Sequence, residues 1–450
     1  MKQHEAIYDA RQLGTGKIMI LGLQHMFAMF GATVLVPIIT GLNISTTLLF
    51  AGLATLFMHF VTNNKVPVFL GSSFAFLGGY AAVKQAGTDA GMDTAQALSY
   101  ACVGVACAGL LYLVLSAICK AWGSNNVMKY FPPVVTGPII IAIGLNLAPS
   151  AINNCSTNWW IALVAIVVVI VCNIWGKGMI KIIPILLGVI ASYVVAAVSG
   201  NVDFTAVKDA AWFGLPIIWK NTGLYVLTSS ETDWGMVLTS IITIVPIAFA
   251  TMMEHVGDIS AIGGTVGRNY IKDPGLHRTL IGDGVGTIIA SLFGAPANTT
   301  YGENTGVLAL TKVYDPLAIK IAACYAILLS FSPKFAAVIE VMPTATIGGV
   351  SLILYGMISA IGVRNVVENK TNFQESRNVI VAALILGLAV GINFSEAGAI
   401  PIVIGDITIN MTGLAVASIV GILLNAILPG KDYHFVEEPD ETLASSLGKY

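Results

Sequence analysis

Three carboxylates and a histidine in strongly apolar surroundings are the side chains of this chain best suited to chemistry. Glu254, His255 and Asp258 lie within one apolar stretch, and Glu303 lies in another. Residues four apart share a helix face, so Glu254 and Asp258 are expected to point the same way. Burial and like charge both oppose ionisation, so these groups would share a proton. The pattern favours proton coupling, and the alternative is a structural polar network between helices.

Glu303 belongs to an unusual stretch, residues 296–311, which reads PANTTYGENTGVLALT. It is too polar to face lipid and too short for a full membrane span, yet both flanks are apolar. Non-helical backbone at membrane depth persists only where protein or a water-filled cavity satisfies its polar groups. A carboxylate at that depth indicates function by default. We therefore interpret this stretch as one wall of a substrate site.

A second interrupted stretch, residues 67–74, reads PVFLGSSF and has the same order of proline, small or hydroxyl residues and an aromatic residue. A helix that begins at membrane depth directs unpaired N–H groups and a positive dipole end into a cavity. Helices beginning after Ser73 and after Tyr301 would donate hydrogen bonds to ligand carbonyl oxygens. The alternative is that these prolines and glycines only kink packed helices. Two interruptions in matching positions favour a transporter site.

The remaining buried polar residues have less specific interpretations. Asp283 either joins the carboxylate network or orients a neighbouring helix, and His25, beside Gln24, is expected to be a hydrogen-bonding strut. The six cysteines lie mostly in apolar stretches without metal-ligand spacing, so we expect small buried hydrophobes and no metal site.

Composition identifies the class of protein that holds these residues. The 450 residues are 56% hydrophobic and 10% charged, whereas soluble proteins carry about 25% charged residues. The chain is therefore an integral membrane protein whose surroundings are the lipid bilayer. Its net charge of −2 and lack of a basic patch give no indication of nucleic-acid binding. Residues 1–17 are charged and lack a cleavable signal pattern, so we expect the first span to be retained.

A membrane span needs roughly 20 apolar residues, and we predict an all-α polytopic protein with fourteen spans, some of them short. Their ranges are 18–40, 45–63, 66–83, 96–119, 131–150, 159–175, 182–200, 235–260, 278–296, 298–314, 316–333, 342–362, 377–393 and 411–429.

Charge distribution supports this count. With both termini in the cytoplasm, most lysines and arginines fall on the cytoplasmic side, and the outer side holds only Lys84, Lys208, Lys220 and Lys334. An outer loop, residues 201–234, divides the spans into two sets of seven. Because seven is odd, the second set enters the membrane in the opposite orientation, which is the inverted repeat common in secondary transporters.

The motif Glu303-Asn304-x-Gly306-x4-Thr311-Lys312 resembles the signature of the nucleobase–ascorbate transporter family, also called nucleobase:cation symporters of the second kind. Resemblance covers about residues 18 to 430 and includes the motifs Leu23-Gln-His25, Leu70-Gly-Ser-Ser-Phe-Ala-Phe76, Glu254-His-Val-Gly257, Pro274-Gly-Leu-His-Arg278, Thr300-Tyr-Gly-Glu-Asn304 and Gly348-Gly-Val-Ser-Leu-Ile-Leu-Tyr355.

The resemblance implies fourteen segments in two inverted repeats, with short antiparallel strands in segments 3 and 10. Residues 18–119 and 235–333 would form a core that carries substrate, and residues 131–200 and 342–429 a gate domain. The core would move against the gate to give alternating access. Residues 1–17 and 430–450 would be cytoplasmic, and the family typically forms homodimers in the cell (inner) membrane.

The resemblance also implies site roles. Glu254 and Glu303 would accept N–H groups of a nucleobase, backbone N–H groups of Phe74 and Gly302 would meet its carbonyls, and Tyr301 and Tyr355 would line the site. Proton coupling would fall to Glu254, Asp258, Glu303 and Asp283, with the proton as coupling ion and no other cofactor. Supporting roles would fall to Gln24, His25, Ser73, His255, Asn304 and Thr311.

These residues favour a proton-coupled uracil importer. Glutamate at position 303 is similar to the uracil permease branch of the family. In contrast, Asp258 stands where the best-known uracil permeases have histidine, and aspartate at position 283 is more similar to the purine branch. A xanthine or urate symporter is therefore the alternative, and an anion exchanger of the same fold is a more distant one. We expect no enzyme, because an aspartyl protease using Asp283 and Asp315 would need its Tyr-Asp motif before the Gly-x-Gly-Asp motif, not after it.

Overall fold

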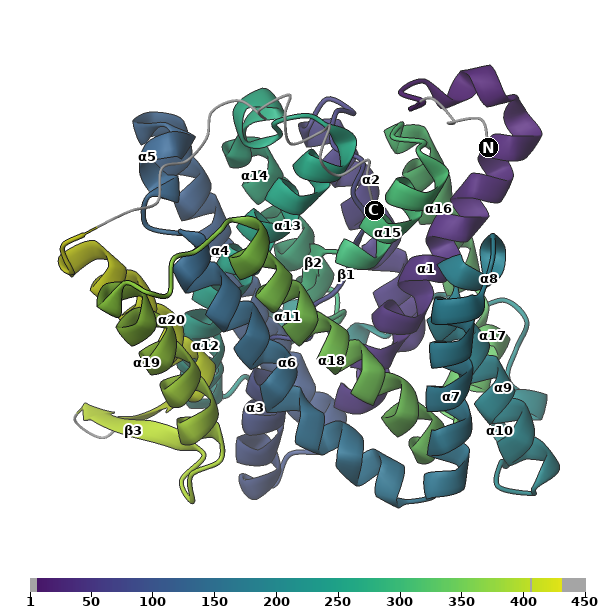
Figure 1. The fold of residues 1–450 in the computed structure, drawn as a ribbon. Helices are drawn as coiled ribbons and strands as arrows, with labels where there is room; N and C mark the ends of the chain where they lie inside the picture. Colours follow the sequence, from purple (N-terminus) through teal and green to yellow (C-terminus); the bar gives the residue numbers. More distant parts are fainter. Residues whose placement is uncertain (1–5, 405–406, 431–450) are drawn as a thin grey trace.

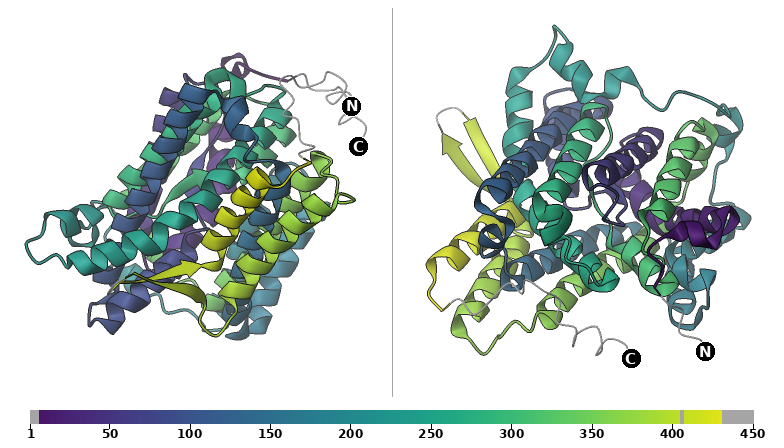
Figure 2. Two further views of the ribbon diagram at one scale, coloured as in Figure 1. Left: turned by 90° about the vertical axis from the view of Figure 1, so that its left-hand side faces the viewer. Right: turned by 90° about the horizontal axis from the view of Figure 1, so that it is seen from above.

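The computed structural model describes residues 6–404 and 407–430 and shows a mostly helical protein whose long helices pack side by side (Figure 1). The expected tail at 431–450 and residues 1–5 of the expected N-terminal segment lie outside the described residues. Two further views show that two short strands, β1 and β2, lie inside the bundle, whereas a hairpin, β3–β4, projects at its edge (Figure 2).

Seven helical segments of the described chain are long and apolar enough to cross a membrane, which confirms a multi-pass membrane protein. They are α1 (Thr15–Thr40), α2 (Ile44–Val61), α4 (Thr94–Trp122), α6 (Pro133–Ser156), the segment Trp234–Val266 formed by α12 (Trp234–Ile244), η3 (Val245–Ile247) and α13 (Ala248–Val266), α18 (Thr344–Glu368) and α19 (Ser376–Asn393).

Shorter helices fill the other predicted ranges. α16 (Pro316–Ser330) and α17 (Pro333–Glu340) are bent by 89° and would form an eighth span if taken together. Three shorter helices are apolar: α7 (Trp159–Trp175), α9 (Pro184–Val198) and α20 (Gly413–Ile427). α14 (Leu276–Leu292) is more polar, and the interrupted segments contain α3 (Leu77–Asp89) and α15 (Gly302–Thr311). Smaller elements are η1 (Ala10–Leu13), α5 (Ser124–Met128), α8 (Met179–Ile182), α10 (Thr205–Asp209), η2 (Trp219–Asn221), α11 (Gly223–Thr228) and η4 (Ile271–Gly275).

The strands β1 (Leu70–Ser72) and β2 (Asn298–Thr300) pair antiparallel, with Gly71 opposite Thr299. This confirms the short antiparallel strands expected in segments 3 and 10. The Asn298 side chain donates to the carbonyl of Gly286 at 3.3 Å, and Thr287 Oγ1 donates to the carbonyl of Asn298 at 2.9 Å. The Thr287 side chain of α14 thus satisfies extended backbone that could not persist in lipid, and the Asn298 side chain anchors β2 to the same helix.

Gly71 allows β1 to pack closely on Tyr301, the residue that follows β2. A Cβ at Gly71 would lie 2.4 Å from the ring of Tyr301, so only glycine permits this contact. The Tyr301 hydroxyl donates to the carbonyl of Ser72 at 2.9 Å. The ring therefore fixes β1 against the start of α15.

Two local expectations are wrong. The helix of the third segment begins at Leu77, not directly after Ser73, because Ser73 N still donates to the carbonyl of Ala297 and a turn is needed to redirect the chain. The structure also contains a second antiparallel pair, β3 (Ala399–Ile404) and β4 (Ile407–Thr412), where only helix and loop were expected. The sequences AIPIVI and ITINMT are rich in β-branched residues, which favour strands.

Candidate functional site

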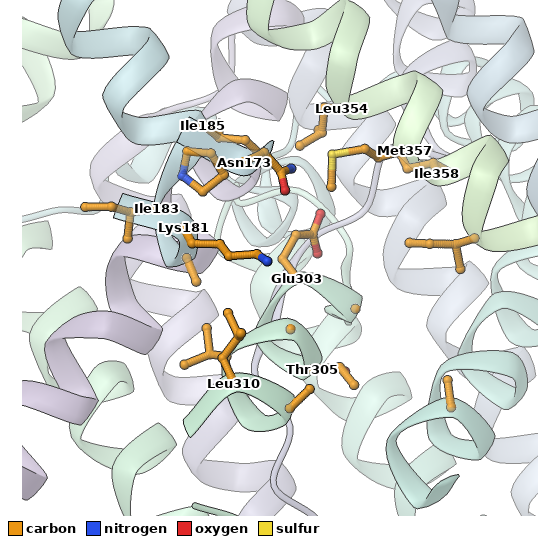
Figure 3. A pocket seen from close by; sticks show the side chains of 18 of the residues that line it. Asn173, Lys181, Ile183, Ile185, Glu303, Thr305, Leu310, Leu354, Met357 and Ile358 are labelled. Atoms are coloured by element: carbon orange, nitrogen blue, oxygen red, sulfur yellow. The ribbon is translucent and has the colours of Figure 1, made fainter. Parts of the chain in front are cut away.

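The N-terminal end of α15 borders two spaces that share lining residues. The larger encloses about 1400 Å³ including its open mouth, and it extends past Thr265 and Leu310 toward the C-terminal ends of α13 and α15. Figure 3 shows Glu303 pointing into this cavity. The smaller encloses about 400 Å³ and is lined by residues that include Phe74, Glu254 and Thr300. Asp258, Gly302 and Glu303 border both spaces.

Two helices hold the carboxylates at these spaces. α13 carries Glu254 and Asp258 one turn apart, and α15 begins at Gly302, so Glu303 lies in its first turn. A methyl group at Gly302 would lie 4.0 Å from Asp258 Oδ1, so the two helices meet here. No side chain of the described residues caps the N-terminus of α15. Its free N–H groups and positive dipole end favour a hydrogen-bond acceptor at this point.

Buried polar atoms beside the smaller space lack partners. Glu254 Oε2, at the lining of this space, and Ser73 Oγ, one residue before the lining residue Phe74, have no hydrogen-bond partner within 6–404 and 407–430. A buried polar atom left unpaired costs roughly 1–3 kcal/mol. This cost is reasonable at a position where a ligand supplies the missing hydrogen bond.

Apolar side chains from the predicted gate domain complete the wall. Phe74 meets Tyr355 of α18 edge to face, with ring centroids 5.7 Å apart and planes at 76°. Ile140 of α6 and Ile358 of α18 line the same small space. Tyr355 therefore contacts the lining residue Phe74, whereas the Tyr301 hydroxyl is engaged by β1. The arrangement suits a flat ring with polar edges.

His255 and Asp283 form a separate buried pair. His255 Nδ1 lies 3.0 Å from Asp283 Oδ2 and 3.0 Å from Thr300 Oγ1, and its Nε2 lies 3.0 Å from Thr279 Oγ1. Neither residue lines the two spaces. The pair links α13 to α14 and β2 directly behind the carboxylates, so Asp283 joins His255 and not the cavity wall.

The residues given supporting roles divide into two groups. Asn304 Nδ2 lies 3.1 Å from His25 Nδ1 and donates to the His25 carbonyl at 3.1 Å, so α1 braces the first turn of α15. Gln24, beside His25, keeps Oε1 buried without a partner in the described chain. Thr311 lies at the far end of α15, about 13 Å along the helix from Gly302, where its hydroxyl donates to the Val307 carbonyl. It is outside the site.

The structure adds one amide and two cationic side chains to the cavity lining that the sequence did not single out: Asn173 of α7, Lys181 of α8 and Arg364 of α18. Figure 3 shows Asn173 and Lys181 beside Glu303. Lys181 and Arg364 entered the sequence analysis only through the charge balance across the membrane. The approach of Lys181 to Glu303 depends on packing between segments more than 100 residues apart in the sequence. Gly176 and Gly178, shortly before Lys181, were the local signal of a tight turn.

Comparison with known proteins decides the family. Residues 16–398 match the Xan_ur_permease family, described as the permease family. The chain belongs to this family of nucleobase–ascorbate transporters. The resemblance of its motifs is thereby confirmed, as is the expectation of a permease and not an enzyme. Among the described residues, no cluster of histidine, cysteine or carboxylate side chains could hold a metal ion.

Curated relatives of this nucleobase–ascorbate transporter include uracil permeases. The chain is 40% identical to the uracil permease of Bacillus caldolyticus, covering 92% of this chain and 93% of that protein. It is 38% identical to the uracil permease of Bacillus subtilis strain 168 (90% and 91% covered) and 36% identical to that of Escherichia coli K12 (90% of each).

Solved structures show the same fold at low identity. The transmembrane domain of the cyanobacterial bicarbonate transporter BicA matches with a TM-score of 0.60 at 13% identity, covering 94% of this chain and 99% of that one. The murine anion transporter solute carrier 26 family member A9, in its inward-facing state, matches with a TM-score of 0.57 at 10% identity, covering 95% and 73%. These likenesses concern the fold alone.

Proposed function

We propose that this nucleobase–ascorbate transporter imports uracil together with protons across the cell (inner) membrane. The observation that carries the proposal is the convergence of Glu254 and Glu303 on one small space at the uncapped start of α15. Relatives named uracil permeases, 36–40% identical over nine-tenths of the chain, support the choice of substrate.

Recognition follows from the chemistry of the base. Uracil presents N–H donors and carbonyl acceptors around one small ring. Glu254 and Glu303 accept its N–H groups, and the backbone N–H groups of Phe74 and Gly302 donate to its carbonyls. The edge-to-face pair of Phe74 and Tyr355 covers the ring. Each polar edge then has a partner, which avoids the cost of roughly 1–3 kcal/mol for an unpaired buried group.

Proton coupling is assigned to the carboxylates. Glu254, Asp258 and Glu303 border the same small space, where like charges disfavour ionisation of all three. A proton that enters with the substrate neutralises one of these carboxylates and relieves the repulsion. The core loaded with substrate and proton is therefore less negative than an empty core in which all three acids are ionised. Asp283, paired with His255, completes the coupling set behind the cavity.

The proposed architecture is fourteen segments in two inverted repeats. Helix packing supports it, because α4 packs on α14 as α16 packs on α2, α7 packs on α9 as α19 packs on α20, and α7 packs on α18 as α19 packs on α6. The pairs β1–β2 and α6–α18 then lie on the pseudo-twofold axis. This symmetry supports a core of residues 18–119 and 235–333 that moves against a gate of residues 131–200 and 342–429, in a homodimer with cytoplasmic termini.

A xanthine or urate symporter is the second candidate. Asp283 and Asp258 favour it, since the first resembles the purine branch and the second replaces the histidine of well-known uracil permeases. The larger cavity would also admit a two-ring base.

Uptake of labelled uracil and labelled xanthine, in cells that lack their own permeases, tests both candidates. We expect saturable uracil uptake that collapses with a protonophore and resists competition by xanthine. Preferential xanthine uptake would establish the second candidate. Saturable uracil uptake insensitive to the protonophore and to Glu254→Gln or Glu303→Gln would remove the first.

A further inference from the structure

α8 is a four-residue helix that places a lysine at the mouth of the larger cavity. It follows Gly176-Lys177-Gly178, where Gly178 adopts a φ of +57°, and it ends before Pro184. Only glycine adopts such a φ without strain, so the turn that presents α8 depends on Gly178. Although α8 joins two helices of the predicted gate, it contacts α1 and α15 of the predicted core. It therefore bridges the two domains at the mouth.

The side chain of Lys181 is directed at the site. Lys181 and Glu303 line the same cavity, and Figure 3 shows the ammonium group of Lys181 pointing toward the Glu303 carboxylate. Lys181 forms no ion pair within the part of the chain that the structure describes, where the pairs are Lys65–Asp273, His255–Asp283 and Arg364–Glu368. Its flexible stem allows the ammonium group to approach or leave the carboxylate.

The other charged groups around this cavity do not take the same role. Asp258, on α13, is 7% exposed and borders the cavity from the core side. Arg364, on α18, also borders the cavity, but its guanidinium lies 3.6 Å from Glu368 on the surface. Lys181 is therefore the lining cation of the described chain without a carboxylate partner, and Glu303 is the carboxylate that it faces.

We propose that Lys181 is a release residue, a positioning cation that competes with bound substrate for the Glu303 carboxylate when the cavity is open at α8. The inference rests on the proposed function, in which Glu303 accepts an N–H group of uracil. A carboxylate that binds an ammonium ion is a weaker acceptor for a neutral N–H group. Lys181 thus lowers substrate affinity in the open state and speeds substrate release, without being part of the binding site itself.

Uracil binding to purified full-length protein tests this proposal, with Lys181→Met compared to wild type. An exposed ion pair changes an equilibrium constant by roughly twofold to fivefold, so we expect uracil to bind Lys181→Met two to five times more tightly. The maximal uptake rate should fall because release slows, which separates affinity from turnover. Lys181→Arg should restore wild-type affinity, and Lys177→Met, an exposed lysine outside the cavity lining, is the matched control.

Each outcome of this experiment is decisive. Equal affinity of Lys181→Met and wild type would overturn the inference alone, whatever the turnover. Weaker binding by Lys181→Met would also overturn it, because Lys181 would then contact the substrate. Failure to bind uracil by wild type that shows cooperative thermal unfolding would contradict the proposed function itself and the inference with it.

Discussion

The two interrupted segments pair with each other but contribute differently to the site. α15 begins immediately after β2, and it carries Glu303 in an uncapped first turn. α3 begins several residues after β1, following a turn that contains Phe74, and it has no acidic residue in its first turn. Similar sequences in matching positions have thus become a charged half-site and an aromatic half-site.

This difference indicates that one half-site mainly recognises the polar groups of the substrate and the other mainly encloses its ring. The half-site of β2–α15, together with α13, supplies carboxylates and N–H groups. The half-site of β1–α3, together with α18, supplies the Phe74–Tyr355 contact, and its one proposed polar contact is the backbone N–H of Phe74, which side-chain substitution leaves in place. Substitutions in the first half-site should abolish transport, whereas substitutions in the second should weaken it in proportion to lost contact.

Removing a carboxylate of the charged half-site should have the largest effect. A hydrogen bond to a charged group contributes about 1.5–3 kcal/mol, so Glu303→Gln and Glu254→Gln should reduce uracil uptake by at least tenfold and to background if the proton is also lost. Uptake of labelled uracil at matched expression measures this. Glu375→Gln, at an exposed position before α19, is the control. Normal uptake by Glu303→Gln would contradict the assignment of substrate recognition to the charged half-site.

Breaking the buried pair behind the charged half-site should affect folding most. A buried polar group that loses its partner costs roughly 1–3 kcal/mol, so Asp283→Asn should lower the thermal unfolding temperature, because His255 Nδ1 lies 3.0 Å from the Asp283 carboxylate. Unfolding of detergent-purified protein measures this. The unfolding temperature of Glu303→Gln should be close to that of wild type. Equal unfolding temperatures for wild type and Asp283→Asn would show that Asp283 has no structural role.

Truncation in the aromatic half-site should have an intermediate effect. Aromatic pairs contribute about 0.5–1.5 kcal/mol beyond their buried area, so Phe74→Ala should weaken uracil binding by several-fold without abolishing coupling. Equilibrium binding and protonophore-sensitive uptake measure the two parts. Phe60→Ala, 76% exposed on α2, should change neither. Loss of proton coupling in Phe74→Ala would show that coupling is not confined to the charged half-site.

The smallest effect is expected at the far end of the charged half-site. Residues 7–10 lie across the C-terminal ends of α13 and α15: Tyr8 donates to the Val266 carbonyl at 2.8 Å, its ring lies 4.5 Å below the Arg268 guanidinium, and Ile7 N donates to the Lys312 carbonyl. An exposed cation–π contact contributes about 0.5–1 kcal/mol. Tyr8→Ala should therefore reduce stability slightly and uptake less than twofold, and Tyr8→Phe should keep most of the stability.

Sequence reasoning predicted the parts of the molecule that local chemistry controls. Polar residues beside proline at membrane depth predicted the two interrupted segments, the family resemblance implied the β1–β2 pair within them, and the four-residue spacing of Glu254 and Asp258 placed both carboxylates at one space. It failed where tertiary packing decides. The position of Lys181 beside Glu303 depends on α8 crossing from gate to core, and the hairpin β3–β4 replaces a stretch that apolar content alone assigned to loop and helix.

Proton movement during uracil uptake tests the central claim most directly. Purified protein in weakly buffered liposomes should take up protons when uracil is added outside, and the external pH should rise in proportion to the uracil transported. Glu303→Gln should give neither signal. Uracil uptake by wild type without any change in external pH would contradict the proposed symport.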